Sequence, residues 1–280
     1  MTPKTKIRKF LICFLLIALS VPTELLFAQD FYPPDIKLIK DRNALVVALT
    51  EKDQPPFFYV DKKGELAGLD IDIAKSLAQG LGVRLRFDRS AKSFNDLIPN
   101  VASGRADVAI SKLSRTSARA QMIGFTNPYI TFHQALILNR LELAKKAPTN
   151  EDTIRFIKNF TGKIGVIANS SYVAYARKNF PSAVVVEYPS WNEVVDAVFK
   201  GEILAGYRDE MEIKKIIRSR SDASLKVKTV VLRDTRDDIA IAVAWQNTHL
   251  LYWLNLQLAS MDLDLSADRL LDMYPDIFEE

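Results

Sequence analysis

Apolar runs of strand length alternate along the chain with segments in which apolar residues recur at helical spacing. Ala44–Leu49 is such a run, and Val83–Asp88 alternates as a half-buried strand does. Between them, Asp70–Leu81 carries apolar side chains four positions apart, which predicts a helix that Gly80 and Gly82 bring to an end. This β-α-β order predicts an α/β fold in which largely parallel sheets are flanked by helices.

The pattern occurs twice. Ser93–Ile98 resembles Ser190–Val195, an offset of 97 positions (190 − 93). Each copy opens with Ser and has an acidic residue three positions later, which is a helix-capping pattern, and each continues through a Gly into a short apolar strand. Two such units predict two lobes of like design. The alternative is a chance similarity between two amphipathic helices.

The same offset relates the polar residues that follow the two strands. Ser111, Lys112 and Ser114 follow the first strand, and Arg208 and Asp209 follow the second, so that position 112 corresponds to position 209. Ligands of open α/β sheets bind outside the carboxyl ends of the strands. We therefore expect one binding cleft between the two lobes.

The N-terminal segment changes the meaning of the net charge of +4. Four basic residues precede the uncharged run Phe10–Val21, which is too short for an ordinary membrane span, and Ala28 follows. This predicts a secretory signal peptide over residues 1–28, with an N-terminal anchor as the alternative. The remainder has 34 Lys and Arg against 33 Asp and Glu, so we expect a periplasmic or otherwise extracytoplasmic protein without a nucleic-acid partner.

Thiol and metal chemistry have little support. The only cysteine, Cys13, lies in the leader, which leaves no thiol for a nucleophile, a disulfide or a metal ligand. His133 and His249 are too far apart for a metal-binding spacing. We expect neither a metal nor a cofactor.

The segment Ser111–Arg119 has the densest set of polar residues after any predicted strand. If Thr116 caps a helical turn, its hydroxyl and the Arg119 guanidinium can face one spot. A guanidinium binds a carboxylate with two parallel hydrogen bonds, and hydroxyls and free amides add donors. A solvated charged loop explains the same residues equally well.

Five segments follow one another in a fixed order: Gly64–Ala74, Leu97–Asp107, Ser114–Tyr129, Gly162–Val166 and Gly201–Asp209. In this order they resemble the bacterial extracellular solute-binding proteins of family 3, the polar amino-acid-binding type that serves ABC transporters. The resemblance covers the chain beyond the leader. It implies a two-lobed periplasmic-binding-protein-like fold, with two hinge strands between lobes that close on a ligand.

The resemblance also suggests where the chain passes between the lobes. We expect the first crossing near Leu138–Leu141 and the return near Arg233–Asp238, with a C-terminal helix from His249 to about Ser260 on the first lobe. The predicted lobes are 29–138 with 236–280, and 139–235.

Roles follow from the resemblance residue by residue. Arg119 would bind the α-carboxylate of the ligand, helped by Ser114 and Thr116 from the first lobe and by Ser170 and Ser171 from the second. The hydroxyl pair departs from the family pattern, because Asn169 precedes it where Gly is usual.

Asp209 would accept hydrogen bonds from the ligand's α-ammonium. Phe94 and Phe57 would pack on its side chain, with core packing as the alternative for both and as the favoured one for Phe57. Glu51 suits a cationic side chain and Lys112 an acidic one, so the charge of the ligand stays open.

We therefore expect an extracytoplasmic solute-binding protein that clamps an amino acid or a closely related small solute. It would act as a monomer, deliver the solute to the membrane permease of an ABC transporter, and catalyse no reaction. One alternative is an enzyme of the same fold, a periplasmic dehydratase similar to cyclohexadienyl dehydratase, with Glu51 or Asp209 as its acid. The other is a ligand-sensing subunit of a membrane receptor.

Overall fold

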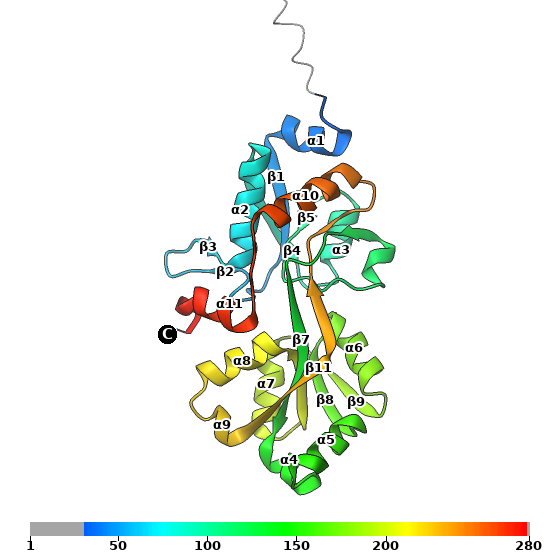
Figure 1. Ribbon diagram of the computed structural model, residues 1–280, viewed down its shortest axis with the longest axis vertical. Coiled ribbons are helices and arrows are strands. Elements are labelled where there is room, and N and C mark those ends of the chain that lie inside the picture. The colour runs from blue at the N-terminus through cyan, green and yellow to red at the C-terminus, as the bar shows by residue number, and fades with distance from the viewer. Residues whose placement is uncertain (1–30, 279–280) are drawn as a thin grey trace, which may run out of the picture. The chain divides into compact units, whose positions relative to one another are not determined.

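The structure is a computed structural model that describes residues 31–278. Two five-stranded sheets form the centres of two lobes, and both belong to one compact unit that begins at Asp35 (Figure 1). The predicted two-lobed α/β fold is confirmed. The expected signal peptide, residues 1–28, lies outside the described residues. Within the described part of the chain, no helix is long and apolar enough to cross a membrane.

The first lobe surrounds a sheet of strand order β4-β1-β5-β12-β6. Strand β1 is parallel to β4 and β5, whereas β12 is antiparallel to β5 and β6. The elements of this lobe are α1 (Pro34–Arg42), β1 (Ala44–Thr50), β2 (Tyr59–Val60), β3 (Leu66–Ala67), α2 (Leu69–Leu81), β4 (Arg84–Ala91), α3 (Leu97–Ala102), β5 (Val108–Ala109), the 3-10 helix η2 (Arg119–Gln121), β6 (Ile123–Phe125), β12 (Ala242–Ala244), α10 (Thr248–Ser260), α11 (Ala267–Met273) and the 3-10 helix η3 (Pro275–Phe278).

The second lobe surrounds a sheet of strand order β11-β7-β10-β8-β9. Strand β8 is parallel to β9 and β10, and β7 is antiparallel to β10 and β11. The elements of this lobe are β7 (Ile130–Asn139), α4 (Arg140–Lys146), α5 (Asn150–Lys158), β8 (Gly162–Ile167), α6 (Ser171–Asn179), β9 (Ala183–Tyr188), α7 (Trp191–Lys200), β10 (Ala205–Asp209), α8 (Glu210–Ser219), α9 (Ala223–Lys226) and β11 (Val227–Ile239).

The two repeated units occupy the same place in the two lobes. Helix α3 leads into β5 and helix α7 leads into β10, and each of these strands is the central one of its sheet. The serine at the start of each unit accepts a hydrogen bond from the amide three residues later, at 3.3 Å for Ser93 and 3.4 Å for Ser190. The duplicated architecture brings the carboxyl ends of β5 and β10 into corresponding positions.

Strands β7 and β11 connect the lobes (Figure 1). They pair from Asn139–Val227 to Ile130–Ile239, with a shift of register between Leu232 and Asp237 that falls in the predicted return segment. Residues 130–138, which we expected in the first lobe, pair within the second sheet. Ile130 and Phe132 pack in the core of the first lobe, whereas Gln134–Leu138 pair with β10 of the second lobe, so the first crossing lies within β7 and earlier than Leu138–Leu141. The reason for the difference is that β7 is one unbroken strand whose apolar pattern does not reveal which sheet it joins.

Each lobe has its own apolar core. In the first lobe, Leu77 of α2 packs in one cluster with Leu250 and Leu254 of α10, which places α10 on the first lobe as expected. In the second lobe, the rings of Phe160, Phe180 and Tyr207 stack edge to face. Burial of these side chains stabilises each lobe by itself, since each apolar side chain contributes about 1.5–3 kcal/mol.

The turn before α2 requires glycine at position 68. Gly68 has a φ of 114°, and a Cβ atom at this position would lie 2.5 Å from the carbonyl oxygen of Phe57. The backbone of this turn is thus packed directly on the segment that follows β1, next to the lobe interface.

Candidate functional site

Lys112 follows β5 in a backbone conformation that is unusual for lysine. Its φ is 47°, in the left-handed region that side chains other than Gly, Asn and Asp avoid. The buried carboxylate of Asp70 accepts a hydrogen bond from the Lys112 amide at 2.7 Å and another from the Tyr129 hydroxyl at 2.7 Å. Burial raises the pKa of Asp70 to about 7. These contacts hold the lysine backbone, while its Nζ lies 5.1 Å from the centre of the Phe57 ring.

The Lys112 ammonium reaches the second lobe. Asp209 ends β10 and caps α8 by accepting a hydrogen bond from the Glu212 amide at 3.1 Å. The Lys112 Nζ lies 2.9 Å from Asp209 Oδ2 and 2.7 Å from Glu212 Oε1, and all three side chains are at most 2% exposed. The two positions that the offset of 97 relates, 112 and 209, therefore meet as an ion pair across the lobes.

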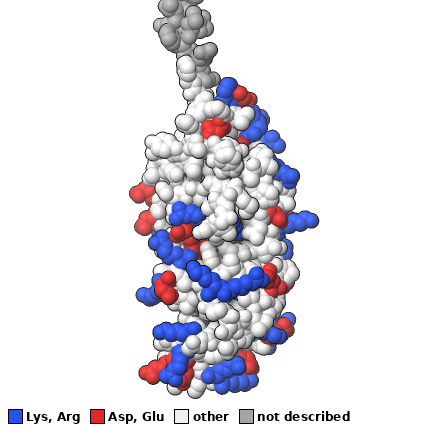
Figure 2. Space-filling view, turned by 90° about the vertical axis from the view of Figure 1, so that its right-hand side faces the viewer, with Lys and Arg blue, Asp and Glu red and all other residues white. Residues whose placement is uncertain are grey.

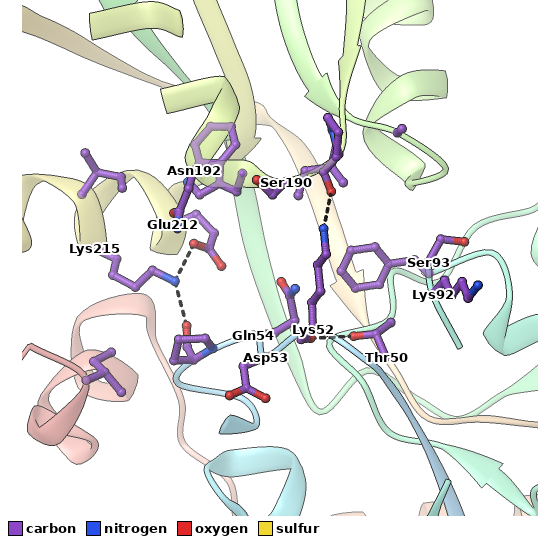
Figure 3. A pocket seen from close by; sticks show the side chains of 18 of the residues that line it. Thr50, Lys52, Asp53, Gln54, Lys92, Ser93, Ser190, Asn192, Glu212 and Lys215 are labelled. Carbon is purple, nitrogen blue, oxygen red and sulfur yellow. Dashed lines mark hydrogen bonds and ion pairs between the residues drawn. The ribbon is translucent and has the colours of Figure 1, made fainter. Parts of the chain in front are cut away.

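Two more cations surround the same carboxylates. The Arg208 guanidinium lies 3.7 Å from Asp209 and 3.8 Å from Glu212, and Lys215 Nζ lies 2.7 Å from Glu212 Oε2. Lys215 also donates to the Pro55 carbonyl of the first lobe, as Figure 3 shows. Burial alone would raise the pKa of Glu212, but its neighbouring cations hold that pKa well below the ordinary value. We call Lys112, Arg208, Asp209, Glu212 and Lys215 the interlobe charge cluster.

A group of hydroxyls lies beside this cluster. The Ser171 hydroxyl donates to Ser114 Oγ at 2.9 Å across the lobes, and the Tyr172 hydroxyl donates to Asp237 Oδ2 at 3.0 Å. Asp237 Oδ1 is buried and has no hydrogen-bond partner among the described residues. Burial, together with the charge of nearby Asp209, raises the pKa of Asp237 to about 6.

Asn169 provides the turn that precedes the hydroxyl pair. Its φ is 54°, in the left-handed region that asparagine tolerates better than most residues, so it can take the place of the usual glycine. The Ser170 hydroxyl, however, donates to the Ile167 carbonyl at 2.6 Å and so stabilises the turn.

Arg119 is buried against neutral partners. Its guanidinium donates to the Ser114 carbonyl at 2.8 Å and to Asn95 Oδ1 at 3.0 Å, and its amide donates to the Thr116 hydroxyl at 3.3 Å. Burial lowers the pKa of Arg119 to about 10, so the guanidinium stays charged near neutral pH. Among residues 31–278, no carboxylate forms an ion pair with it. A buried cation of this kind is suited to receive an anion.

Two cavities lie at the lobe interface. The inner one has a volume of about 10 Å³, room for about one water molecule, so the lobes are closed around it. The outer one has a volume of about 400 Å³, within the range of small-molecule sites, and is lined by both lobes (Figure 3). Phe94 lines both cavities. Its ring and that of Trp191 each lie 5.8 Å from the Arg208 guanidinium carbon, a distance that permits cation–π attraction.

The structure brings most of the predicted site residues together. Six of them line the inner cavity: Phe94, Lys112, Ser114, Ser170, Ser171 and Asp209. Arg119 and Thr116 lie directly behind it, linked to Ser114 and to each other by the hydrogen bonds given above.

Glu51 and Phe57 line neither cavity. Glu51 is exposed, and its carbonyl accepts a hydrogen bond from the Arg89 side chain. Phe57 is fully buried and stacks edge to face on Phe132, which agrees with the alternative of core packing.

Several residues of the site were not among the predicted ones. Glu212 is three positions beyond Asp209, a helical spacing that could have placed it on the same side of α8. Asp237 belongs to a highly charged strand in which no single residue stands out. Five additional residues that line a cavity also take part in the contacts described above: Tyr172, Trp191, Glu212, Lys215 and Asp237. Arg208, which the sequence placed at the end of the second strand without a role, belongs to the cluster.

The face of the molecule in Figure 2 carries side chains of both charges. On the face in Figure 2, basic side chains form a band across the middle, with acidic side chains close to them. This mixed surface agrees with the near-neutral charge beyond residue 28.

Comparisons with known proteins give the same fold and a consistent family. The arginine-binding protein 1 of an Escherichia coli K12 ABC transporter is 27% identical over 224 residues, which are 79% of this chain and 86% of that protein. The L-cystine-binding protein TcyJ of the same strain is 27% identical over 228 residues, 81% of this chain and 80% of that protein.

Solved structures agree. An amino acid ABC transporter substrate-binding protein of Streptococcus pneumoniae, bound to L-arginine, superposes with a TM-score of 0.70 at 26% identity, covering 87% of this chain and 100% of that one. An ancestral amino acid-binding protein described as a precursor of cyclohexadienyl dehydratase superposes with a TM-score of 0.68 at 26% identity, covering 85% and 98%. Residues 46–276 match the model of the bacterial extracellular solute-binding proteins, family 3, and the chain therefore belongs to that family.

Proposed function

We propose that this protein binds an amino acid or a closely related small solute between its two lobes and delivers it to the permease of an ABC transporter. The observation that carries the proposal is the buried Arg119, whose hydrogen-bond partners are neutral oxygens at the edge of the interlobe cavity. The relatives with known ligands are named as amino-acid-binding proteins, which supports the same class of solute. The protein would act as an extracytoplasmic monomer, secreted by a signal peptide over residues 1–28.

In the proposed site, Arg119 binds the carboxylate of the solute. Ser114 of the first lobe and Ser171 of the second, which bond to each other in this closed structure, would turn their hydroxyls to the same group. Only the closed arrangement offers both lobes to one ligand, so binding would favour closure. The remainder of the solute would extend past Phe94 into the outer cavity.

Binding rather than catalysis is favoured by the placement of the two acids considered for an enzyme. Glu51 is exposed and lines neither cavity, and Asp209 is paired with Lys112. Neither is positioned as a free acid over the site. The proposed hinge is the pair of strands β7 and β11.

The test is a thermal-shift screen of residues 29–280 against the amino acids and simple carboxylates, repeated with Arg119→Ala. A bound ligand raises the melting temperature in a concentration-dependent way. Loss of a charge-assisted hydrogen bond costs about 1.5–3 kcal/mol, so Arg119→Ala should weaken binding by at least about tenfold. Arg105→Ala, which removes an exposed arginine of the same lobe, is the matched control and should bind like the wild type. Absence of any shift, or near-native affinity of Arg119→Ala, would refute the proposal.

A further inference from the structure

The interlobe charge cluster contains more cations than carboxylates. Three cations (Lys112, Arg208 and Lys215) contact two carboxylates (Asp209 and Glu212). Four of these side chains are at most 4% exposed, so water screens their charges poorly. The excess of one cation is confined to the cluster itself, because the carboxyl of Asp237 lines the same inner cavity beside Lys112, Arg208 and Asp209.

Lys112 is held in place by both ends. Its backbone has the left-handed conformation and donates to Asp70, and its ammonium lies between Asp209 and Glu212. Backbone conformations of this kind persist where the surrounding structure determines them, and they cluster at binding and catalytic sites. The lysine therefore presents its ammonium at one defined position.

That position coincides with the ammonium site of the proposed clamp. Asp209 is the residue assigned to accept the α-ammonium of a ligand, and in the closed structure its Oδ2 atom faces Lys112 Nζ at 2.9 Å. A ligand ammonium and the lysine ammonium would compete for one carboxylate. Because the lysine is attached to the chain, it is always present at this position when the lobes close.

Groups that favour an anion remain available. Arg119 has neutral acceptors, and Arg208 Nη1 is buried without a hydrogen-bond partner among the described residues. Two buried carboxyl oxygens, Asp237 Oδ1 and Asp209 Oδ2, also have no hydrogen-bond partner among the described residues, and both residues line the inner cavity. These acceptors do not favour an anion, but a hydroxyl group of the ligand can donate to them.

We infer that the ligand is a small carboxylic acid without an α-ammonium group, of the 2-oxo or 2-hydroxy acid class, and that Lys112 takes the place of the missing ammonium. This inference rests on the proposed function, because it uses the same clamp and the same carboxylate site at Arg119. It names the class of solute that the clamp accepts.

Isothermal titration calorimetry of residues 29–280 with matched compounds tests the inference. The pairs are L-leucine with 4-methyl-2-oxopentanoate and its 2-hydroxy analogue, L-phenylalanine with phenylpyruvate, L-glutamate with 2-oxoglutarate, and L-arginine with its 2-oxo analogue. We expect at least one oxo or hydroxy acid to bind at least tenfold more tightly than the amino acid of the same skeleton. Lys112→Met, which keeps the length of the side chain and removes its charge, should reverse that preference, whereas Lys163→Ala, at an exposed lysine of β8, should leave it unchanged.

The outcomes are separable. Equal or tighter binding of the amino acid in every pair that binds would overturn the inference and leave the proposed function intact. Binding of neither class would overturn the proposed function as well. The affinities of the wild-type protein for each amino acid and its oxo or hydroxy analogue test the inference even if Lys112→Met does not fold. Circular dichroism shows whether that variant is folded.

Discussion

Removal of the charge of Glu212 should release the two lobes from each other. The Glu212 carboxylate lies 2.7 Å from Lys112 Nζ of the first lobe and 2.7 Å from Lys215 Nζ of its own helix. Glu212→Gln retains the size of the side chain but leaves three cations around the single carboxylate of Asp209. Opening of the lobes would return these cations to water.

The size of the effect follows from burial. Loss of one partner of a buried ion pair costs about 3–5 kcal/mol, because the other charge remains desolvated. A cost of this size in the closed form shifts the equilibrium between closed and open forms toward the open form by roughly a hundredfold or more. The neighbouring cations hold the pKa of Glu212 below its ordinary value. The stabilisation that the charged Glu212 gives to the folded protein is therefore fully present above the ordinary pKa of glutamate and is lost as the pH falls through the lowered pKa.

Small-angle X-ray scattering of the ligand-free protein at pH 7 measures the opening as a larger radius of gyration, and urea unfolding measures the stability. Glu202→Gln, at an exposed glutamate before β10, serves as the control and should match the wild type. If Glu212→Gln scatters like the wild type and its free energy of unfolding lies within about 0.5 kcal/mol of it, the cluster does not hold the lobes together.

Three further changes test other parts of the structure. Burial raises the pKa of Asp237 to about 6. The contribution of this carboxyl to the free energy of unfolding is therefore fully present below the ordinary pKa of aspartate and is lost as the pH rises through 6. Asp237→Asn should remove roughly 3 kcal/mol of the pH dependence of that free energy between pH 4 and 7, measured by urea unfolding. Gly68→Ala should lower the free energy of unfolding by about 2 kcal/mol or more, measured by chemical denaturation, because its Cβ would meet the Phe57 carbonyl. Arg218, 2.6 Å from Asp272 across the lobes, is half-exposed, so Arg218→Ala should cost less than about 1 kcal/mol, and the loss should vanish in denaturation at high salt.

The fold was largely predictable because each lobe repeats one apolar pattern. The strand at Ala44, the helix from Leu69 to Leu81 and the duplicated α-β units follow directly from the spacing of apolar residues. The assignment of β7 to a sheet was not predictable, since Ile130–Asn139 has the composition of a buried strand in either lobe. Partners of a strand depend on contacts between distant segments, which spacing along the chain does not reveal.

The site was predictable in position and less so in its contacts. Polar residues at the ends of β5 and β10 marked the interface correctly, and the offset of 97 related Lys112 to Asp209. Their pairing was not foreseen, because a strand end indicates where a side chain starts and not where it points. For the same reason Glu51, one residue beyond β1, was expected in the cleft although its side chain is exposed.

Asp237 belongs both to the proposed hinge and to the candidate site. In β11 it pairs with Phe132 of β7 immediately after the shift of register, and its carboxyl borders the inner cavity. If β7 and β11 bend as the proposed hinge, a contact between the solute and this carboxyl would act on the bending strands without a relay of intermediate residues. A substitution of Asp237 should then change both how tightly a solute is held and how readily it is released.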